Sequence, residues 1–142
     1  MTVNGKDGSS VAVDGSTGSV TLTGNDGSTA TIAAGTSAPN LAGTSINRIT
    51  AGGATVATLD DGMKYGGDFG TTSSVKLNNQ VNVKGEATSE ADLTTGNIGV
   101  VSSQDGDNGL LTVKLNKDIN LGDTGSVTTG NTVVNNDGVK VR

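Results

Sequence analysis

The chain has 142 residues, a formal net charge of -5, and no cysteine or histidine. Without those two residue types an ordinary zinc or redox site cannot be built, and an acidic chain without a basic stripe is not a typical nucleic-acid binder. Only 32% of the residues are hydrophobic, with one Tyr and one Phe, so one copy has little bulk from which to make a core.

Small chains with thin cores are usually stabilised by disulfides, metals or partner subunits. The absence of cysteine and histidine leaves association of identical chains as the expected source of stability. Disorder is disfavoured because the net charge is low and the apolar residues alternate regularly. We therefore expect a folded chain that completes its core in a homo-oligomer, without cofactor or nucleic acid.

The density of glycine, 23 residues, predicts an all-β fold of short strands and tight turns. Asp-Gly and Asn-Gly pairs favour positive φ at both central positions of a hairpin turn. Six Asp-Gly steps begin at Asp7, Asp14, Asp26, Asp61, Asp105 and Asp137, and two Asn-Gly steps begin at Asn4 and Asn108.

Residues 1–44 contain a loose repeat, SSVAVDG, GSVTLTGNDG and STATIAAG. The pairs Val11/Val13, Val20/Leu22 and Ala30/Ile32 each place two apolar side chains on one strand face, with mainly Ser and Thr opposite. Pro39, in GTSAPNLAG, is typical of a connector. We expect an N-terminal Gly/Asp-rich β-repeat segment over 1–44 and a second β module over 45–142.

Strands are expected in the second module at ATVATL (54–59), SVKLNNQVNVKG, NIGVVSS, LLTVKL and the segments that follow. Asn79 shares the parity of the apolar residues around it, and we interpret it as a bulge rather than an axial contact. The best helical candidate is one turn over 89–93. The side chains expected to face a common axis are Val75, Leu77, Val81, Val83, Leu111, Val113 and Leu115.

Carboxylates are the remaining candidates for catalysis. Glu86 and Glu90 lie in GEATSEAD, which is more typical of a solvated loop than of a catalytic pair. Asp105 and Asp107 begin an oxygen-rich stretch that leaves calcium open, but the twelfth position from Asp105 is an Asn rather than a Glu, so we favour a hairpin turn. We expect no catalytic, metal or cofactor site; the ligand-binding residues are unknown.

VATLDDGMKYGGDFG, VKLNNQVNVKGEA, LTTGNIGVV, GLLTVKLNKDINLG and SVTTGNTVVNNDGVKV occur in an order that resembles the head modules of trimeric autotransporter adhesins. The resemblance implies a homotrimeric, β-prism-like head in a Gram-negative cell-surface fibre that binds host cells, matrix or other bacteria. It also implies virulence and an outer-membrane anchor in the parent protein. The tryptophan of one head type, the NSVAIG-type roll repeats and a heptad stalk are absent.

Two other hypotheses remain open. A trimeric phage tail-fibre segment would share the Gly-rich, aromatic-poor β pattern. A carbohydrate-active β-helix is disfavoured because sugar platforms usually need aromatic side chains, and only Tyr65 and Phe69 are present. No stretch is long enough to span a bilayer, and the first six residues lack the layout of a signal peptide. We interpret Met1 as an expression start and the chain as part of a longer exported protein.

Overall fold

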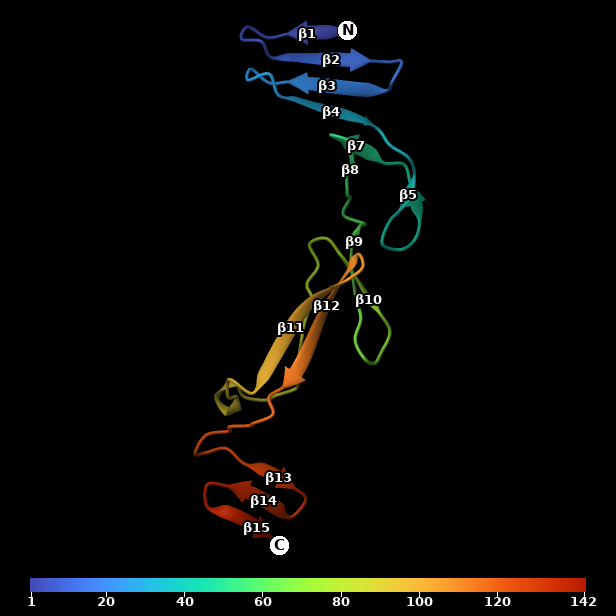
Figure 1. Ribbon diagram of the computed structural model, residues 1–142. Coiled ribbons are helices and arrows are strands. Elements are labelled where there is room, and N and C mark those ends of the chain that lie inside the picture. The colour runs from blue at the N-terminus through green and yellow to red at the C-terminus, as the bar shows by residue number, and fades with distance from the viewer. The chain divides into compact units, whose positions relative to one another are not determined.

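The computed structural model describes residues 1–142 and is all-β, with one short 3-10 helix (Figure 1). Two compact units divide it, Met1–Val83 and Lys84–Arg142. The boundary expected between residues 44 and 45 stays a prediction; strands on either side of that position pair with each other in the first unit.

The first unit is built around a six-stranded antiparallel sheet in the order β1-β2-β3-β4-β7-β8. Its strands alternate apolar and polar residues, and tight turns connect β1, β2, β3 and β4 in succession. Their bounds are β1 Thr2–Asn4, β2 Ser10–Asp14, β3 Ser19–Thr23, β4 Thr29–Ala34, β7 Ile49–Ala51 and β8 Ala54–Thr55. The predicted repeat over 1–44 therefore forms consecutive hairpins.

Two small hairpins complete this unit. One pairs β5 (Ala38–Pro39) with β6 (Ser45–Ile46), and the other pairs β9 (Gly62–Tyr65) with β10 (Ser73–Lys76). A proline is accommodated at position 39 because both strands of a two-stranded sheet are edge strands, where a missing N–H donor costs no ladder hydrogen bond. Neither hairpin pairs with the six-stranded sheet; each forms a separate two-stranded sheet.

The second unit begins with the 3-10 helix η1 (Glu90–Asp92), which confirms the helical turn predicted around 89–93. A long hairpin follows, β11 (Ile98–Asp105) with β12 (Asn108–Leu115). A three-stranded meander then joins β13 (Val127–Thr129), β14 (Thr132–Asn135) and β15 (Gly138–Val141). The strands predicted at NIGVVSS, LLTVKL and DGVKV are confirmed.

The turns differ from the prediction. No Asp has a positive φ, so Asp-Gly steps do not supply two positive-φ positions. At Gly8 (φ 90°) and Gly27 (φ 85°) the Asp precedes one left-handed Gly, as in three-residue hairpin loops. Only the loop Gly52-Gly53 between β7 and β8 has positive φ at both of its residues, 59° and 83°.

The strand predicted to run through residues 75–83 is wrong beyond Lys76. Asn78 has φ 72°, and the Asn79 amide donates to the Lys76 carbonyl at 3.1 Å, so a turn replaces the expected bulge. Asn adopts this left-handed conformation more readily than most residues, which explains the break. The strand predicted over 54–59 is likewise only Ala54–Thr55.

Candidate functional site

One face of the six-stranded sheet is continuously apolar. In one row across the strands Val3, Val11, Leu22 and Ala30 are direct partners, and in the next row Val13, Val20, Ile32, Ala51 and Ala54 are direct partners. Because directly opposed residues point to the same side, these side chains form one surface. It is the face predicted from the pairs in the N-terminal repeat.

This apolar face is uncovered within the chain. Val13 is 42% exposed, Leu22 41% and Ile32 42%, although they lie on inner strands of the sheet. The opposite face is mainly Ser and Thr, and the Thr21 and Thr31 hydroxyls share a hydrogen bond of 3.1 Å across it. An apolar face backed by a polar one is the pattern of a sheet that packs on a partner surface.

The β11–β12 hairpin has a similar exposed face in the second unit. Ile98, Val100, Val113 and Leu115 are paired in register on one side and are 58 to 68% exposed. A two-stranded hairpin is marginal by itself in water, and three strands or a packing partner are needed for independent stability. The hairpin therefore needs a cover that its own two strands do not supply.

No hydrophobic residue of the chain is buried. The accessible surface is 11708 Å², and it includes the apolar face of the six-stranded sheet and that of the β11–β12 hairpin. The arrangement thus has the chemical character of one subunit's share of a larger core.

The seven residues predicted to face an axis are placed differently by the structure. Leu111, Val113 and Leu115 lie on one face of β12, and Val75 is half-buried in β10. Leu77, Val81 and Val83 fall outside any strand, and Val83 is 94% exposed. Their orientation toward an axis stays a prediction.

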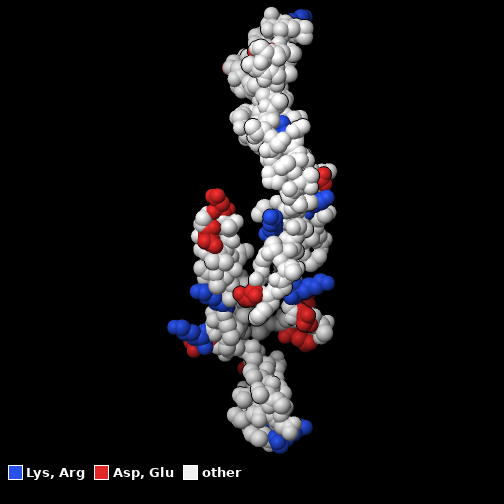
Figure 2. All heavy atoms as spheres, turned by 90° about the vertical axis from the view of Figure 1, so that its right-hand side faces the viewer, with Lys and Arg blue, Asp and Glu red and all other residues white.

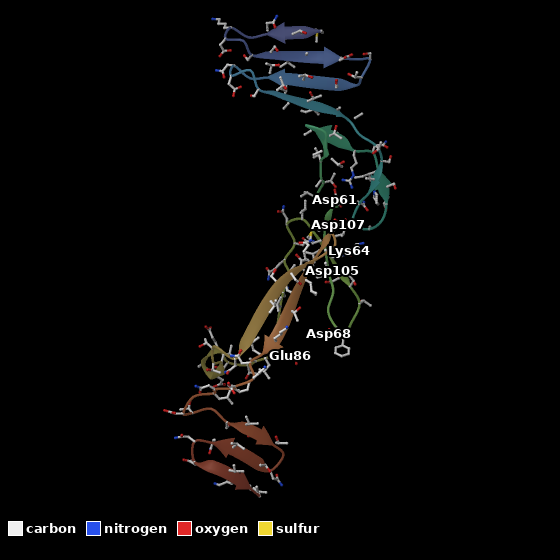
Figure 3. All side chains as sticks on the ribbon, in the orientation of Figure 1. Asp61, Lys64, Asp68, Glu86, Asp105 and Asp107 are labelled. Atoms are coloured by element: carbon white, nitrogen blue, oxygen red, sulfur yellow. The ribbon has the colours of Figure 1, made fainter.

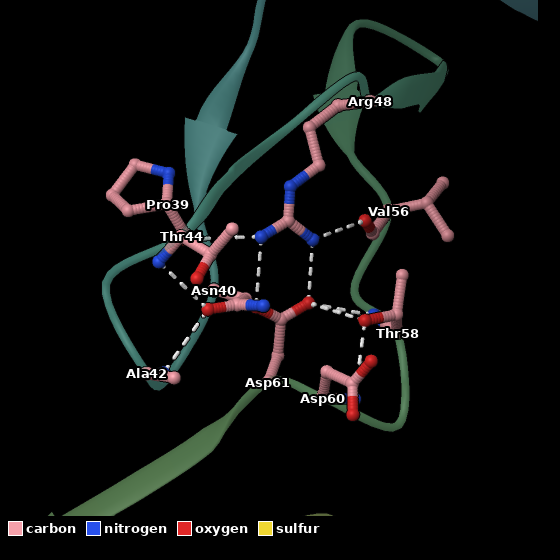
Figure 4. Close-up of polar contacts among 9 residues, drawn as sticks. All are labelled: Pro39, Asn40, Ala42, Thr44, Arg48, Val56, Thr58, Asp60 and Asp61. Carbon is pink, nitrogen blue, oxygen red and sulfur yellow. Dashed lines mark hydrogen bonds and ion pairs between the residues drawn. The ribbon is translucent and has the colours of Figure 1, made fainter.

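A buried polar cluster lies where the six-stranded sheet meets the β9–β10 hairpin (Figure 4). The Arg48 guanidinium donates to both carboxylate oxygens of Asp61, at 2.5 and 2.8 Å, and to the carbonyls of Pro39 at 3.0 Å and Val56 at 3.4 Å. The Arg48 side chain is 4% exposed. These contacts join three chain segments without any apolar core, and we call this cluster the Arg48–Asp61 clasp.

Asp61 is held on a second side by Thr58, whose amide and hydroxyl donate to it at 2.7 and 3.2 Å. Hydrogen bonds from Arg48 and then from the Thr58 amide keep the pKa of Asp61 well below its usual range. The same carboxylate raises the pKa of Arg48. The sequence predicts Asp61 only as a turn residue and does not predict its ion pair with Arg48. The feature that could have indicated the pair is that Arg48 is the one charged residue between Asp26 and Asp60.

Three other carboxylates stabilise turns. Asp7, Asp14 and Asp26 each precede a Gly-Ser pair, and each accepts a hydrogen bond from the Ser hydroxyl, at 2.6 to 2.8 Å. The Ser hydrogen bonds lower the pKa of each of these three groups. We call the three sites the Asp-Gly-Ser turns.

In the second unit the Asn97 side chain forms two hydrogen bonds with the backbone of Asn120, as a paired strand would. Its side-chain amide donates to the Asn120 carbonyl at 2.8 Å and its oxygen accepts from the Asn120 amide at 2.9 Å. Asn97 is buried, with 9% of its surface exposed. This pair fixes the segment that follows β12 against the start of β11.

The acidic candidates do not converge (Figure 3). Asp105 pairs with Asn108 at the tip of β11–β12, whereas Glu86 lies in the segment before η1, away from that tip. Glu86 has φ 63°, and both Glu86 and Glu90 are exposed. No group of three or more acidic side chains is arranged to hold a metal ion, and no helix has the length and apolar character to cross a membrane.

The six-stranded sheet is nearly free of charge. From Ser9 to Leu59 the charged residues are Asp14, Asp26 and Arg48, and Figure 2 shows that end of the chain as mostly uncharged. Charged side chains gather in the later segments, around Lys64 and beyond. Because this face carries almost no charge, it has few groups for ion pairs with a partner. Apolar contact is therefore its main means of association.

No protein-family model matches the chain, and no solved structure matches it. Among curated proteins, 79 residues, or 55% of the chain, are 43% identical to trimeric autotransporter adhesin AtaA from Acinetobacter sp. (strain Tol 5). The chain spans 2% of the length of that protein. Over just more than half of its residues, the chain is thus similar to a short stretch of a trimeric autotransporter adhesin.

Proposed function

We propose that this chain is a non-catalytic passenger segment of a trimeric autotransporter adhesin, exposed on the surface of a Gram-negative bacterium. Three copies bury their apolar sheet faces against one another and form a β-prism-like head. The head mediates adhesion to host cells, matrix or other bacteria, as part of a parent anchored in the outer membrane. The observation that carries the proposal is the absence of any buried hydrophobic residue beside a continuous apolar face.

The similarity to an adhesin supports this proposal over a phage tail-fibre segment, because the matched protein is itself named a trimeric adhesin. The physics of the face supports association but not a particular stoichiometry. Each Val, Leu or Ile fully covered by a neighbour contributes about 1.5 to 3 kcal/mol. A few such side chains per copy contribute enough free energy for the folded state to depend on assembly.

Association is tested by light scattering on the purified chain and on two matched variants of β3. Leu22→Asp places a charge on the apolar face, whereas Thr23→Asp places the same charge on the opposite face, between Ser10 and Thr29. We expect a trimer mass for the unmodified chain and for Thr23→Asp, and loss of the trimer for Leu22→Asp. A folded monomer for the unmodified chain contradicts the proposal.

Adhesion is tested separately with beads that carry the trimer. We expect beads to bind epithelial cells, fibronectin or collagen surfaces, or bacteria, and beads with Leu22→Asp to bind poorly. A trimer that binds none of these favours the tail-fibre hypothesis. Turnover on a glycan panel that is lost in Glu86→Gln or Glu90→Gln would contradict the non-catalytic assignment.

A further inference from the structure

The two Asn-Gly steps of the chain have the same chemistry but different backbone environments. Asn-Gly is the dipeptide in which a backbone amide most readily attacks the preceding side chain, because Gly has no Cβ to hinder the approach. In that reaction the Gly nitrogen bonds to the Asn side-chain carbonyl carbon and ammonia leaves. Water then opens the resulting five-membered imide to aspartate or isoaspartate.

The first step, Asn4-Gly5, is protected by a backbone hydrogen bond. The Gly5 amide donates to the Ser9 carbonyl at 2.6 Å, at the end of the β1–β2 ladder. The attacking nitrogen must lose that bond before it can reach the Asn4 side chain. A backbone hydrogen bond contributes about 1 kcal/mol, so this protection alone slows the reaction about fivefold.

The second step, Asn108-Gly109, lacks this protection. The Asn116 amide donates to the Asn97 carbonyl, and hydrogen-bonded pairs alternate from there along the β11–β12 ladder. By that alternation Gly109 and Gln104 form a non-hydrogen-bonded pair, so the Gly109 N–H points away from β11. The sheet has only two strands, and therefore no further strand accepts this donor.

The surroundings of Asn108 also favour reaction. Asn108 and Gly109 are exposed, next to the two-residue loop Gly106–Asp107 at the hairpin tip. A two-stranded ribbon opens locally more easily than a wide sheet, and its tip opens before its base. At the tip, the Gln104 side-chain amide donates to the carbonyls of Gly106 at 2.9 Å and Asn108 at 3.0 Å, but neither bond engages the Gly109 N–H.

We propose that Asn108-Gly109 is a site of spontaneous deamidation, with water as the co-reactant and ammonia, aspartate and isoaspartate as products. The isoaspartate product adds one methylene to the backbone of β12 and so disrupts its pairing with β11. Either product adds a negative charge beside Asp105 and Asp107. The proposal concerns the hairpin tip alone and does not depend on the proposed function.

The test is peptide mapping by mass spectrometry after incubation of the full chain at neutral and mildly alkaline pH. We expect Asn108 to convert about fivefold faster than Asn4, each rate being divided by that of a synthetic peptide with the same local sequence. Enzymatic methylation of isoaspartate gives an independent readout. Equal normalised rates, a faster Asn4, or an unreactive Asn108 beside a reactive peptide would overturn the proposal.

Gly109→Ala is the matched variant. A Cβ at Gly109 meets no atom within 4 Å and its φ is not positive, so the hairpin accommodates the methyl group. The methyl group hinders the attacking nitrogen, and we expect conversion at Asn108 to fall while that at Asn4 is unchanged. Conversion that persists at the same rate in Gly109→Ala contradicts attack by this amide. Circular dichroism before incubation confirms that the variant is folded.

Discussion

Arg48 and Asp61 show how single polar side chains organise a chain that has no apolar core. The guanidinium is almost fully buried and meets a carboxylate and two backbone carbonyls, so its charge and most of its donors are satisfied. Lys76 and Asp60 form the other ion pair nearby, 2.9 Å apart, but their side chains are 51% and 63% exposed. The two pairs therefore differ in burial while lying in the same hairpin region.

The clasp predicts unequal effects of two matched substitutions. Asp61→Asn leaves the buried Arg48 without its anion, and we expect a clear fall in the thermal unfolding midpoint, because an unpaired buried charge is strongly destabilising. Lys76→Met removes the exposed pair and is expected to cost at most about 1 kcal/mol. Thermal unfolding followed by circular dichroism compares them, and a larger effect of Lys76→Met would contradict the assigned role of the clasp.

Carboxylate hydrogen bonds set the expected dependence of stability on pH. The pKa values of Asp7, Asp14, Asp26 and Asp61 are lower than usual because each folded carboxylate accepts hydrogen bonds. A lowered folded pKa gives stability that is present above the unfolded pKa and is lost as the pH falls through the folded value. We expect stability to decline below about pH 4.

Between pH 5 and 8 little change is expected, since the chain has no histidine. Unfolding midpoints measured across the pH range test both statements. Replacing Ser9, Ser16 and Ser28 by Ala removes three of the donors, so the variant should lose less stability on acidification. An acid response as large as that of the unmodified chain would count against the Asp-Gly-Ser turns as its source.

At this scale the sequence predicts residue types better than residue partners. The Asp-Gly-Ser turns follow from local spacing, because each carboxylate reaches a hydroxyl two residues later. Arg48 and Asp61 are 13 residues apart and meet because the β7–β8 hairpin reverses the chain between them. The Asn97–Asn120 pair spans 23 residues and is equally invisible to local pattern.

Elements were predicted well where alternation and turn residues agree. The hairpins β2–β3, β3–β4 and β11–β12 combine alternating apolar residues with Gly-containing turns, and their registers keep those residues on one face. The pattern failed after Lys76, because alternation persists in a segment that has no strand partner in its own chain. Alternation of apolar and polar residues indicates an extended backbone, but a strand also needs a second strand with which to form hydrogen bonds.

The β9–β10 hairpin depends on one close approach. A Cβ at Gly62 would lie 1.9 Å from the Val75 carbonyl oxygen, so Gly62→Ala forces the strands apart and should cost at least about 1 kcal/mol. Gly66→Ala is the control, since its Cβ would meet only Thr72 Oγ1 at 4.0 Å. Amide hydrogen exchange over 62–76 should rise in the first variant alone, and an unperturbed hairpin in Gly62→Ala would refute the close approach.

For the whole molecule, composition predicted the most important property. A chain with two aromatic residues was expected to lack a core of its own, and no hydrophobic residue is buried. The extent of a partner surface could not be derived from sequence, because it depends on which faces the strand order aligns. The six-stranded order places the apolar residues of β7 beside those of β4, and those of β8 beside β7.

An assembly-dependent fold makes stability depend on concentration. If copies cover one another's apolar faces, the unfolding midpoint should rise with protein concentration, because association stabilises only the folded state. Differential scanning calorimetry over a hundredfold dilution measures this, since for a trimer such a dilution lowers the stability by about 1.8 kcal/mol per subunit, two thirds of RT ln 100. A compact species with a concentration-independent midpoint would show that a single copy is sufficient for folding.

The Asp-Gly-Ser turns recur between strands whose apolar residues fall in the same two rows. Unequal recombination between such repeats in the gene would add or delete a pair of strands without changing the row that each remaining side chain occupies. The length of this region can therefore vary between descendants while its stacking pattern is inherited intact.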